Sequence, residues 1–122
     1  MAIYNSSGKA LQKILYENTT GTTGTVTLSA SSANYKYLEI FYQNSAKTGT
    51  GSVKVYSPNG KGIDMILSST ASGDNIYIVM CRANISGNKI TPSTYSQNHW
   101  AGSDLSIDKT NGIYIYRVIG YN

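Results

Sequence analysis

The feature that most constrains the fold is an alternation of apolar and polar residues with a period of two. It runs cleanly through residues 25–29 and 52–56, and with one exception through residues 63–67. A β-strand has this period because successive side chains point to opposite faces of its sheet. Further segments with strand character are residues 10–16, 37–43, 76–82, 89–91 and 113–121. The sequence therefore predicts an all-β domain, an antiparallel β-sandwich or jelly roll of about eight strands.

Turn residues separate these segments. In Ser57-Pro58-Asn59-Gly60, proline presets φ and Asn-Gly suits a left-handed backbone. Residues 86–89 predict a tight hairpin between residues 83–86 and 89–91. The longest stretch without a clear strand is residues 92–108, which contains the only Trp and the only His and is interpreted as a long loop.

The length of 122 residues fits one domain, which we place at residues 10–122. Residues 1–9 have no periodicity and are interpreted as an N-terminal arm or linker stub. The first residues lack the basic and apolar stretches of a signal peptide. The longest apolar run, residues 76–81, is too short to span a bilayer, so we expect no membrane insertion.

Charge is sparse and scattered. Charged residues make up 13% of the chain, against about 25% in an average domain. The ten Lys and Arg residues are never adjacent, whereas nucleic-acid binding needs a concentrated basic patch. We therefore expect no nucleic-acid partner. Neutral Ser, Thr, Asn and Gly residues and 11 Tyr supply the polarity instead. Such a surface suits neutral sugars, but composition alone favours the simpler interpretation, a protein that must stay soluble outside a cell.

Catalytic and metal-binding patterns are weak. His99 is the only His, so any Ser-His or Cys-His scheme depends on it. No pair among the six acidic residues has a recognisable glycosidase spacing. One His and one Cys do not make a closed zinc site, and the Asp104 and Asp108 spacing is not diagnostic of calcium. We expect a protein that is not an enzyme and has no metal or cofactor.

The best cluster of candidate ligand-binding residues lies in residues 95–100. Tyr95 and Trp100 offer stacking faces, while Asn98 and His99 offer directional polar groups. This mixture is typical of a shallow sugar or protein site. The alternative is that Trp100 plugs one end of the sandwich and its neighbours coat that end.

Two strands carry apolar residues on both faces, and these suggest a subunit interface. The candidates are Tyr37 and Glu39 in one strand and Tyr114, Tyr116 and Arg117 in the other. A strand with one solvent-exposed face needs apolar residues only on its other face. Apolar residues on both faces therefore indicate that the second face packs either on another subunit or under loops. Glu39 and Arg117 each interrupt an apolar row, and we expect them to pair within or between subunits. The alternative is that both rows of side chains are exposed to solvent, where no pairing is needed.

Three segments resemble a known family when they are taken together. They are residues 24–29 leading into 37–42, residues 51–60 with GSVKVYSPNG, and residues 112–121 with GIYIYRVIGY. This set is similar to the C-terminal domains of tail-fibre and minor tail structural proteins of bacteriophages that infect Gram-positive bacteria. The resemblance covers residues 10–122, and no site residue carries over on a motif.

The resemblance implies a β-sandwich head, commonly a homotrimer, on a tail fibre or the particle surface of a virion. Its partners would be other virion proteins and a host cell-surface glycan, often cell-wall carbohydrate. Two alternatives remain open. One is a structural or capsid-decorating virion protein without a receptor role, and the other is a standalone bacterial carbohydrate-binding module, which predicts a monomer with a groove.

Overall fold

The computed structural model of the chain describes residues 11–70 and 75–122. These residues form strands joined by turns, with one short 3-10 helix, η1 (Ser32–Asn34). The strands are β1 (Gln12–Thr22), β2 (Val26–Thr27), β3 (Tyr37–Gln43), β4 (Thr50–Tyr56), β5 (Gly62–Thr70), β6 (Asn75–Ser86), β7 (Lys89–Ala101), β8 (Asp104–Asp108) and β9 (Tyr114–Tyr121). The predicted all-β sandwich is confirmed, with nine strands in the described residues.

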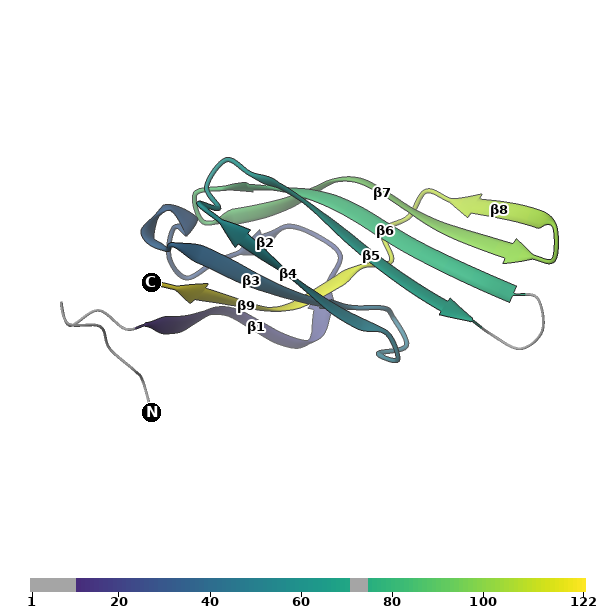
Figure 1. Cartoon of the computed structure of the whole chain (residues 1–122), viewed down its shortest axis with the longest axis horizontal. Helices are drawn as coiled ribbons and strands as arrows, with labels where there is room; N and C mark the ends of the chain where they lie inside the picture. The colour runs from purple at the N-terminus through teal and green to yellow at the C-terminus, as the bar shows by residue number, and fades with distance from the viewer. Residues whose placement is uncertain (1–10, 71–74) are drawn as a thin grey trace.

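The strands build two antiparallel sheets that face each other (Figure 1). Sheet I has the order β1-β9-β3-β4, and sheet II has the order β2-β7-β6-β5. The short strand β8 pairs with β7 on the same edge as β2 but further along the strand. The connection from β4 to β5 carries the chain from one sheet to the other.

The core lies between the sheets and follows the period-two pattern. Leu38 and Ile40 of β3 alternate with half-buried residues and point inward, as do Met65 of β5 and Ile85 of β6. The fully buried side chains also include Val26, Leu28, Ile90, Ile113, Ile115 and Val118. Burial of these aliphatic groups, at about 1.5–3 kcal/mol for each side chain, is the main force that holds the two sheets together.

Turn chemistry agrees with the prediction at both places. The β6–β7 hairpin closes with Ser86 opposite Lys89, and Gly87 has a φ of 56°. Gly60 has a φ of 85° and lies in a turn closed by a bond from the Lys61 amide to the Pro58 carbonyl. Both glycines occupy a backbone region that residues with a Cβ avoid.

Several strand boundaries differ from the sequence-based prediction. β1 runs beyond the predicted strand at residues 10–16 and continues to Thr22, with register shifts that let it bend. Gly21 has a φ of 74° there, and a Cβ on it would lie 2.8 Å from Tyr114 Cβ. β2 contains only two residues. The predicted arm or stub at residues 1–9 lies outside the described residues.

The predicted long loop at residues 92–108 is wrong. β7 runs to Ala101, turns at Gly102 with a φ of 64°, and returns as β8. These strands, with the adjoining half of β6, extend beyond the end of sheet I (Figure 1). We call this extension, formed by residues 75–80, 97–101 and 104–108, the arm.

A β-bulge in β9 changes which side chains face outward. The register slips between Phe41 and Tyr42, where two β9 residues, Tyr116 and Arg117, occupy the space of one. Val118 is therefore buried, while Ile119 is half-buried on the opposite face. The bulge therefore breaks the strict alternation of inward and outward side chains along β9.

Candidate functional site

The arm has two faces, set by strand alternation. Buried Met65 and Cys81 define the inner face of sheet II, which continues along the arm. Tyr77, Gln97 and His99 share that inner face. The outer face carries the intervening residues, including Ile76, Ile78, Asn98 and Trp100 on β6 and β7 and Leu105 and Ile107 on β8.

The four predicted ligand-binding residues therefore do not form one site. Tyr95 and His99 occupy β7 positions whose side chains belong to the inner face. Asn98 and Trp100 occupy positions whose side chains belong to the outer face. The sequence prediction treated them as one loop, in which all four side chains can converge. A strand separates them, so the arm has to be considered as two surfaces.

The inner face holds a pocket of about 280 Å³. It is lined by Tyr77, Gln97, Asn98, His99, Ser106, Ile107 and Asp108. The Tyr77 and His99 rings stack with centroids 4.2 Å apart and an interplanar angle of 2°. His99 Nε2 lies 2.8 Å from Asn75 Oδ1, which orients the imidazole. The pocket thus combines a rigid aromatic wall with amide, hydroxyl and carboxylate groups.

The arm's outer face is largely apolar. Trp100 lies between Ile76 and Leu105 in one cross-strand row, so it does not plug an end of the sandwich. Ile107 is 54% exposed, and Leu105 is 48% exposed. Asn98 is only 7% exposed and donates its amide hydrogen to Ser96 Oγ at 3.2 Å. In this structure Asn98 therefore serves as a hydrogen-bond partner of Ser96 within the arm.

A second pocket, of about 380 Å³, lies at the base of the arm. It is lined by Asp64, Met65, Ile66, Met80, Cys81, Arg82, Thr94, Tyr95, Ser96 and Lys109. Of the four predicted ligand-binding residues, only Tyr95 contributes here. We call it the outer pocket, because Asp64, Ile66, Met80 and Arg82 belong to the outer face.

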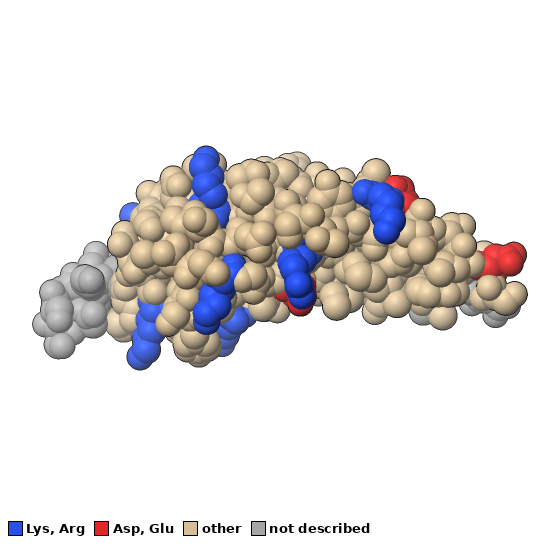
Figure 2. Space-filling view, turned by 90° about the horizontal axis from the view of Figure 1, so that it is seen from above, with Lys and Arg blue, Asp and Glu red and all other residues tan. Residues whose placement is uncertain are grey.

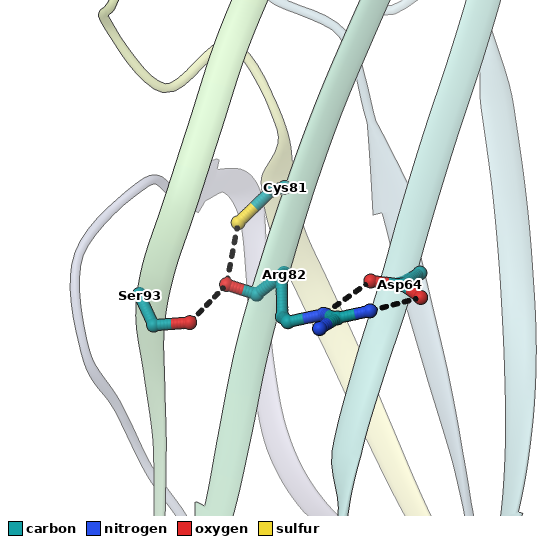
Figure 3. Close-up of polar contacts among 4 residues, drawn as sticks. All are labelled: Asp64, Cys81, Arg82 and Ser93. Atoms are coloured by element: carbon teal, nitrogen blue, oxygen red, sulfur yellow. Dashed lines mark hydrogen bonds and ion pairs between the residues drawn. The ribbon is translucent and has the colours of Figure 1, made fainter.

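An ion pair fixes one wall of the outer pocket. Arg82 donates from Nε to Asp64 Oδ1 at 2.8 Å and from Nη2 to Asp64 Oδ2 at 3.0 Å (Figure 3). Ser93 Oγ donates to the Arg82 carbonyl at 3.2 Å, and Cys81 Sγ lies 3.6 Å from the same oxygen. The hydrogen bond from Arg82 lowers the pKa of the Asp64 carboxyl, so this group is ionised at neutral pH. The paired carboxylate likewise raises the pKa of Arg82.

Cys81 lines the outer pocket but is a poor candidate for a nucleophile. Its side chain belongs to the buried core, and burial raises the pKa of its thiol. The reactive form of a cysteine is the thiolate, which this environment disfavours.

The predicted interface residues lie on the outer face of sheet I. Tyr37 stacks on Tyr121 at 4.5 Å and contacts Tyr56 at 4.9 Å between centroids. Phe41 and Tyr116 are 6.2 Å apart on the same face. Much of the outer face of sheet I is thus an aromatic surface in which neighbouring rings contact one another.

One end of this face packs under the chain's own β1. Gln43 beside Tyr114 is buried, and its amide nitrogen donates to the Thr19 carbonyl at 3.1 Å. A Cβ on Gly21 of β1 would lie 2.8 Å from Tyr114 Cβ, so β1 passes close to Tyr114. At Tyr114 the second face therefore lies next to strand β1 of the same chain, and not under a loop.

Arg117 and Glu39 do not pair with each other within the chain. Arg117 Nη2 donates to Glu17 Oε1 at 2.7 Å, because β1 brings Glu17 opposite Arg117 in the register. Glu39 accepts from the Tyr121 hydroxyl at 3.3 Å and lies beside Lys54 on β4. The sequence-based pairing was wrong for a single chain, since it left β1 out of the neighbourhood of β9.

The two acids considered for calcium, Asp104 and Asp108, are separated by the length of a strand. Asp104 and Asp108 begin and end β8, about 13 Å apart at the usual strand rise. Among residues 11–70 and 75–122, no three His, Cys, Asp or Glu side chains cluster so as to hold a metal ion. The part of the chain that the structure describes also has no helix long and apolar enough to cross a membrane.

Basic side chains are dispersed on the long face drawn in Figure 2, with uncharged surface between most of them. An acidic group lies at its narrow end. This distribution differs from the contiguous basic stripe that nucleic-acid binding proteins present.

Sequence reasoning missed the contributions of Tyr77, Asp108 and Lys109 to the pockets. A signal for β8 was present, because Leu105 and Ile107 alternate with Asp104, Ser106 and Asp108 after a Gly-containing turn. That alternation implies a hairpin partner, and the partner could only be the preceding segment. With the hairpin recognised, residues 97–108 separate into two faces.

These features define a β-sandwich protein with a projecting β-sheet arm that carries a pocket on its inner face and another at its base. No protein-family model, no curated protein and no solved structure matches the chain.

Proposed function

We propose that the chain is the head of a phage virion protein, on a tail fibre or the particle surface, that binds host cell-surface carbohydrate without catalysis. The observation that carries this proposal is the inner pocket of the arm, where the stacked Tyr77 and His99 rings stand beside Gln97, Ser106 and Asp108. The family resemblance of residues 10–122 supplies the virion context.

Sugar chemistry matches this pocket in two ways. A pyranose ring has an apolar face that packs on an aromatic ring, and the rim of hydroxyls both donates and accepts hydrogen bonds. Tyr77 and His99 offer the aromatic surface. The Gln97 amide donates to Thr110 Oγ1 and Asp108 Oδ1 accepts from the Thr110 amide, and the other lone pairs and N–H of these two groups are directional partners for a ligand. Because the two rings already stack, little side-chain entropy is lost on binding.

A glycan array with purified host-type cell-wall polysaccharides tests the proposal. The wild-type chain is expected to bind at least one glycan, and Tyr77→Ala and His99→Ala are expected to weaken that binding by about tenfold or more, the loss of one stacking contact with its hydrogen bonds. Tyr56→Ala is the matched control, because Tyr56 is an exposed tyrosine on sheet I. Equal binding by all four proteins would contradict this site.

A second candidate is a structural or capsid-decorating virion protein, favoured by the outer face of sheet I. Tyr37, Tyr56 and Tyr121 form a continuous ring contact there, and Ile14 of β1, which pairs with Ile119, is 53% exposed. Large apolar surfaces of this kind are typical of subunit contacts. In this case Tyr37, Glu39, Tyr116 and Arg117 would form the seam of a homotrimer.

Light scattering of the purified chain separates these possibilities. A trimer that dissociates on Tyr37→Glu, but not on Tyr77→Ala, would assign sheet I to the seam and leave the arm free for a ligand. A monomer that still binds glycans would favour the standalone carbohydrate-binding module. A monomer without glycan binding would favour a decoration protein that assembles only on the particle.

A further inference from the structure

We propose that the outer pocket is a binding site for an acidic sugar, a monosaccharide-sized ligand that carries a carboxylate or phosphate. This site is separate from the inner pocket and does not depend on carbohydrate binding there. The outer pocket combines the Lys109 ammonium, the Arg82–Asp64 ion pair and an apolar floor.

Lys109 provides the charge that would select an anion. It directly follows the last residue of β8, and it lines the outer pocket together with Ser96. Within residues 11–70 and 75–122, Lys109 forms no ion pair. The charges of Arg82 and Asp64 cancel each other, and Lys109 therefore leaves the pocket with one net positive charge.

The Arg82–Asp64 pair provides a planar set of hydrogen-bonding groups. A guanidinium has five N–H donors, and Asp64 takes one from Nε and one from Nη2. The other N–H groups stay available for a ligand, and the Asp64 oxygens keep lone pairs for ligand hydroxyls. Because the pair is bidentate, these groups are held in one plane before any ligand arrives.

The remaining lining completes the match to a sugar. Ile66, which is 57% exposed, and Met80 offer apolar surface for the C–H face of a ring. Thr94 and Ser96 place hydroxyl-bearing side chains on the neighbouring strand. The volume of about 380 Å³ is within the usual size of small-ligand pockets. A simple inorganic anion would leave the apolar part unused.

Titration of the full chain with glucuronate, glucose 6-phosphate and glucose, followed by amide NMR, tests the proposal. Both acidic probes are expected to shift the amides of Tyr95, Ser96 and Lys109, and glucose is expected to bind about fivefold more weakly, since one partly screened charge contact is worth up to about 1 kcal/mol. The acidic probes are also expected to bind more weakly as the salt concentration rises. A response to only one of them identifies the acid group as carboxylate or phosphate.

Variants show whether Lys109 is responsible. Lys109→Gln is expected to lose the preference for the acidic probes, Lys109→Arg to keep it, and Lys36→Gln to leave it unchanged. Lys36 is the matched control, an exposed lysine in the loop before β3 on sheet I. Equal affinity for glucose and glucuronate in the wild-type chain would overturn the proposal, as would shifts that survive Lys109→Gln unchanged. Neither outcome changes the result expected from the glycan array, which measures binding at the inner pocket through Tyr77→Ala and His99→Ala.

Discussion

The Tyr121 side chain links two residues of β3 on the outer face of sheet I, Tyr37 and Glu39. Its ring stacks on Tyr37, and its hydroxyl donates to Glu39 at 3.3 Å. Burial raises the pKa of Tyr121, and the nearby Glu39 carboxylate raises it further because a phenolate would be repelled. The pKa of Tyr121 therefore depends on its packing against Tyr37 and Glu39 on this face.

We predict that Tyr121 ionises only above the ordinary tyrosine pKa of 10.0. Because its pKa is raised on folding, its contribution to stability is complete below pH 10 and falls as the pH rises through the folded-state value. The measurement is the difference between the ultraviolet pH titrations of the wild type and Tyr121→Phe. A difference curve with its midpoint at or below 10 would contradict the packing described here.

Single residues also show where sequence reasoning reaches its limit. Tyr37, Tyr116 and Arg117 could be placed on an outer sheet face from alternation alone, and they lie there. The partner of Arg117 could not be found, because Glu17 is 100 residues away and only the register of β1 on β9 brings the two together.

At the scale of elements, β7 determines the layout of the possible sites. Its first residues pair with β2 over the core, and its last residues pair with β8 in the arm. Gly112, in the link from β8 to β9, lies against the base of the arm. A Cβ on Gly112 would lie 2.7 Å from both Gln97 Cδ and Val79 Cγ1.

We predict that Gly112→Ala destabilises the chain by about 1–3 kcal/mol, the usual cost of overpacking. Its φ is outside the left-handed region, so the cost is steric rather than a backbone effect. Urea denaturation measures the change. Gly24→Ala is the matched control, because its nearest neighbour atom would be Thr22 Oγ1 at 3.6 Å, an ordinary contact. Equal stability of the two variants would show that the link between β8 and β9 is not closely packed against Gln97 and Val79 of the arm.

Elements were predictable from sequence where one face is buried. β3 was placed at Tyr37–Gln43, as observed, because its apolar residues face the core at every second position. The second half of β7 was missed because neither of its faces packs on sheet I. Tyr95-Ser96-Gln97-Asn98-His99-Trp100 consequently shows no simple apolar period. The candidate site was recognised as a segment, but its two-faced geometry depends on the hairpin with β8.

At the scale of the whole molecule, a two-layered body continues into a single-layered arm (Figure 1). β3 lies between β9 and β4 and faces the core. β8 pairs with β7 alone, and all of its side chains are exposed. The molecule therefore combines regions whose local stabilities differ.

We predict that amide hydrogens in β8 exchange at least about a hundredfold faster than those of Leu38 and Ile40 in β3. Local opening of an exposed edge strand costs far less than the global unfolding that releases a central strand. Hydrogen exchange followed by NMR or mass spectrometry is the measurement. Comparable protection in the two strands would mean that the arm is held by contacts with another molecule, such as a second copy of the chain.

The central position of β9 in sheet I also affects how the chain is made. β9 leaves the ribosome after every other described strand, yet it lies between β1 and β3. Until it emerges, β1 pairs with no other described strand and β3 has an open edge. The meander β5–β6–β7, in contrast, joins neighbours along the chain and is able to form early. A nascent chain must therefore keep half of its sandwich incomplete until synthesis has passed Tyr121.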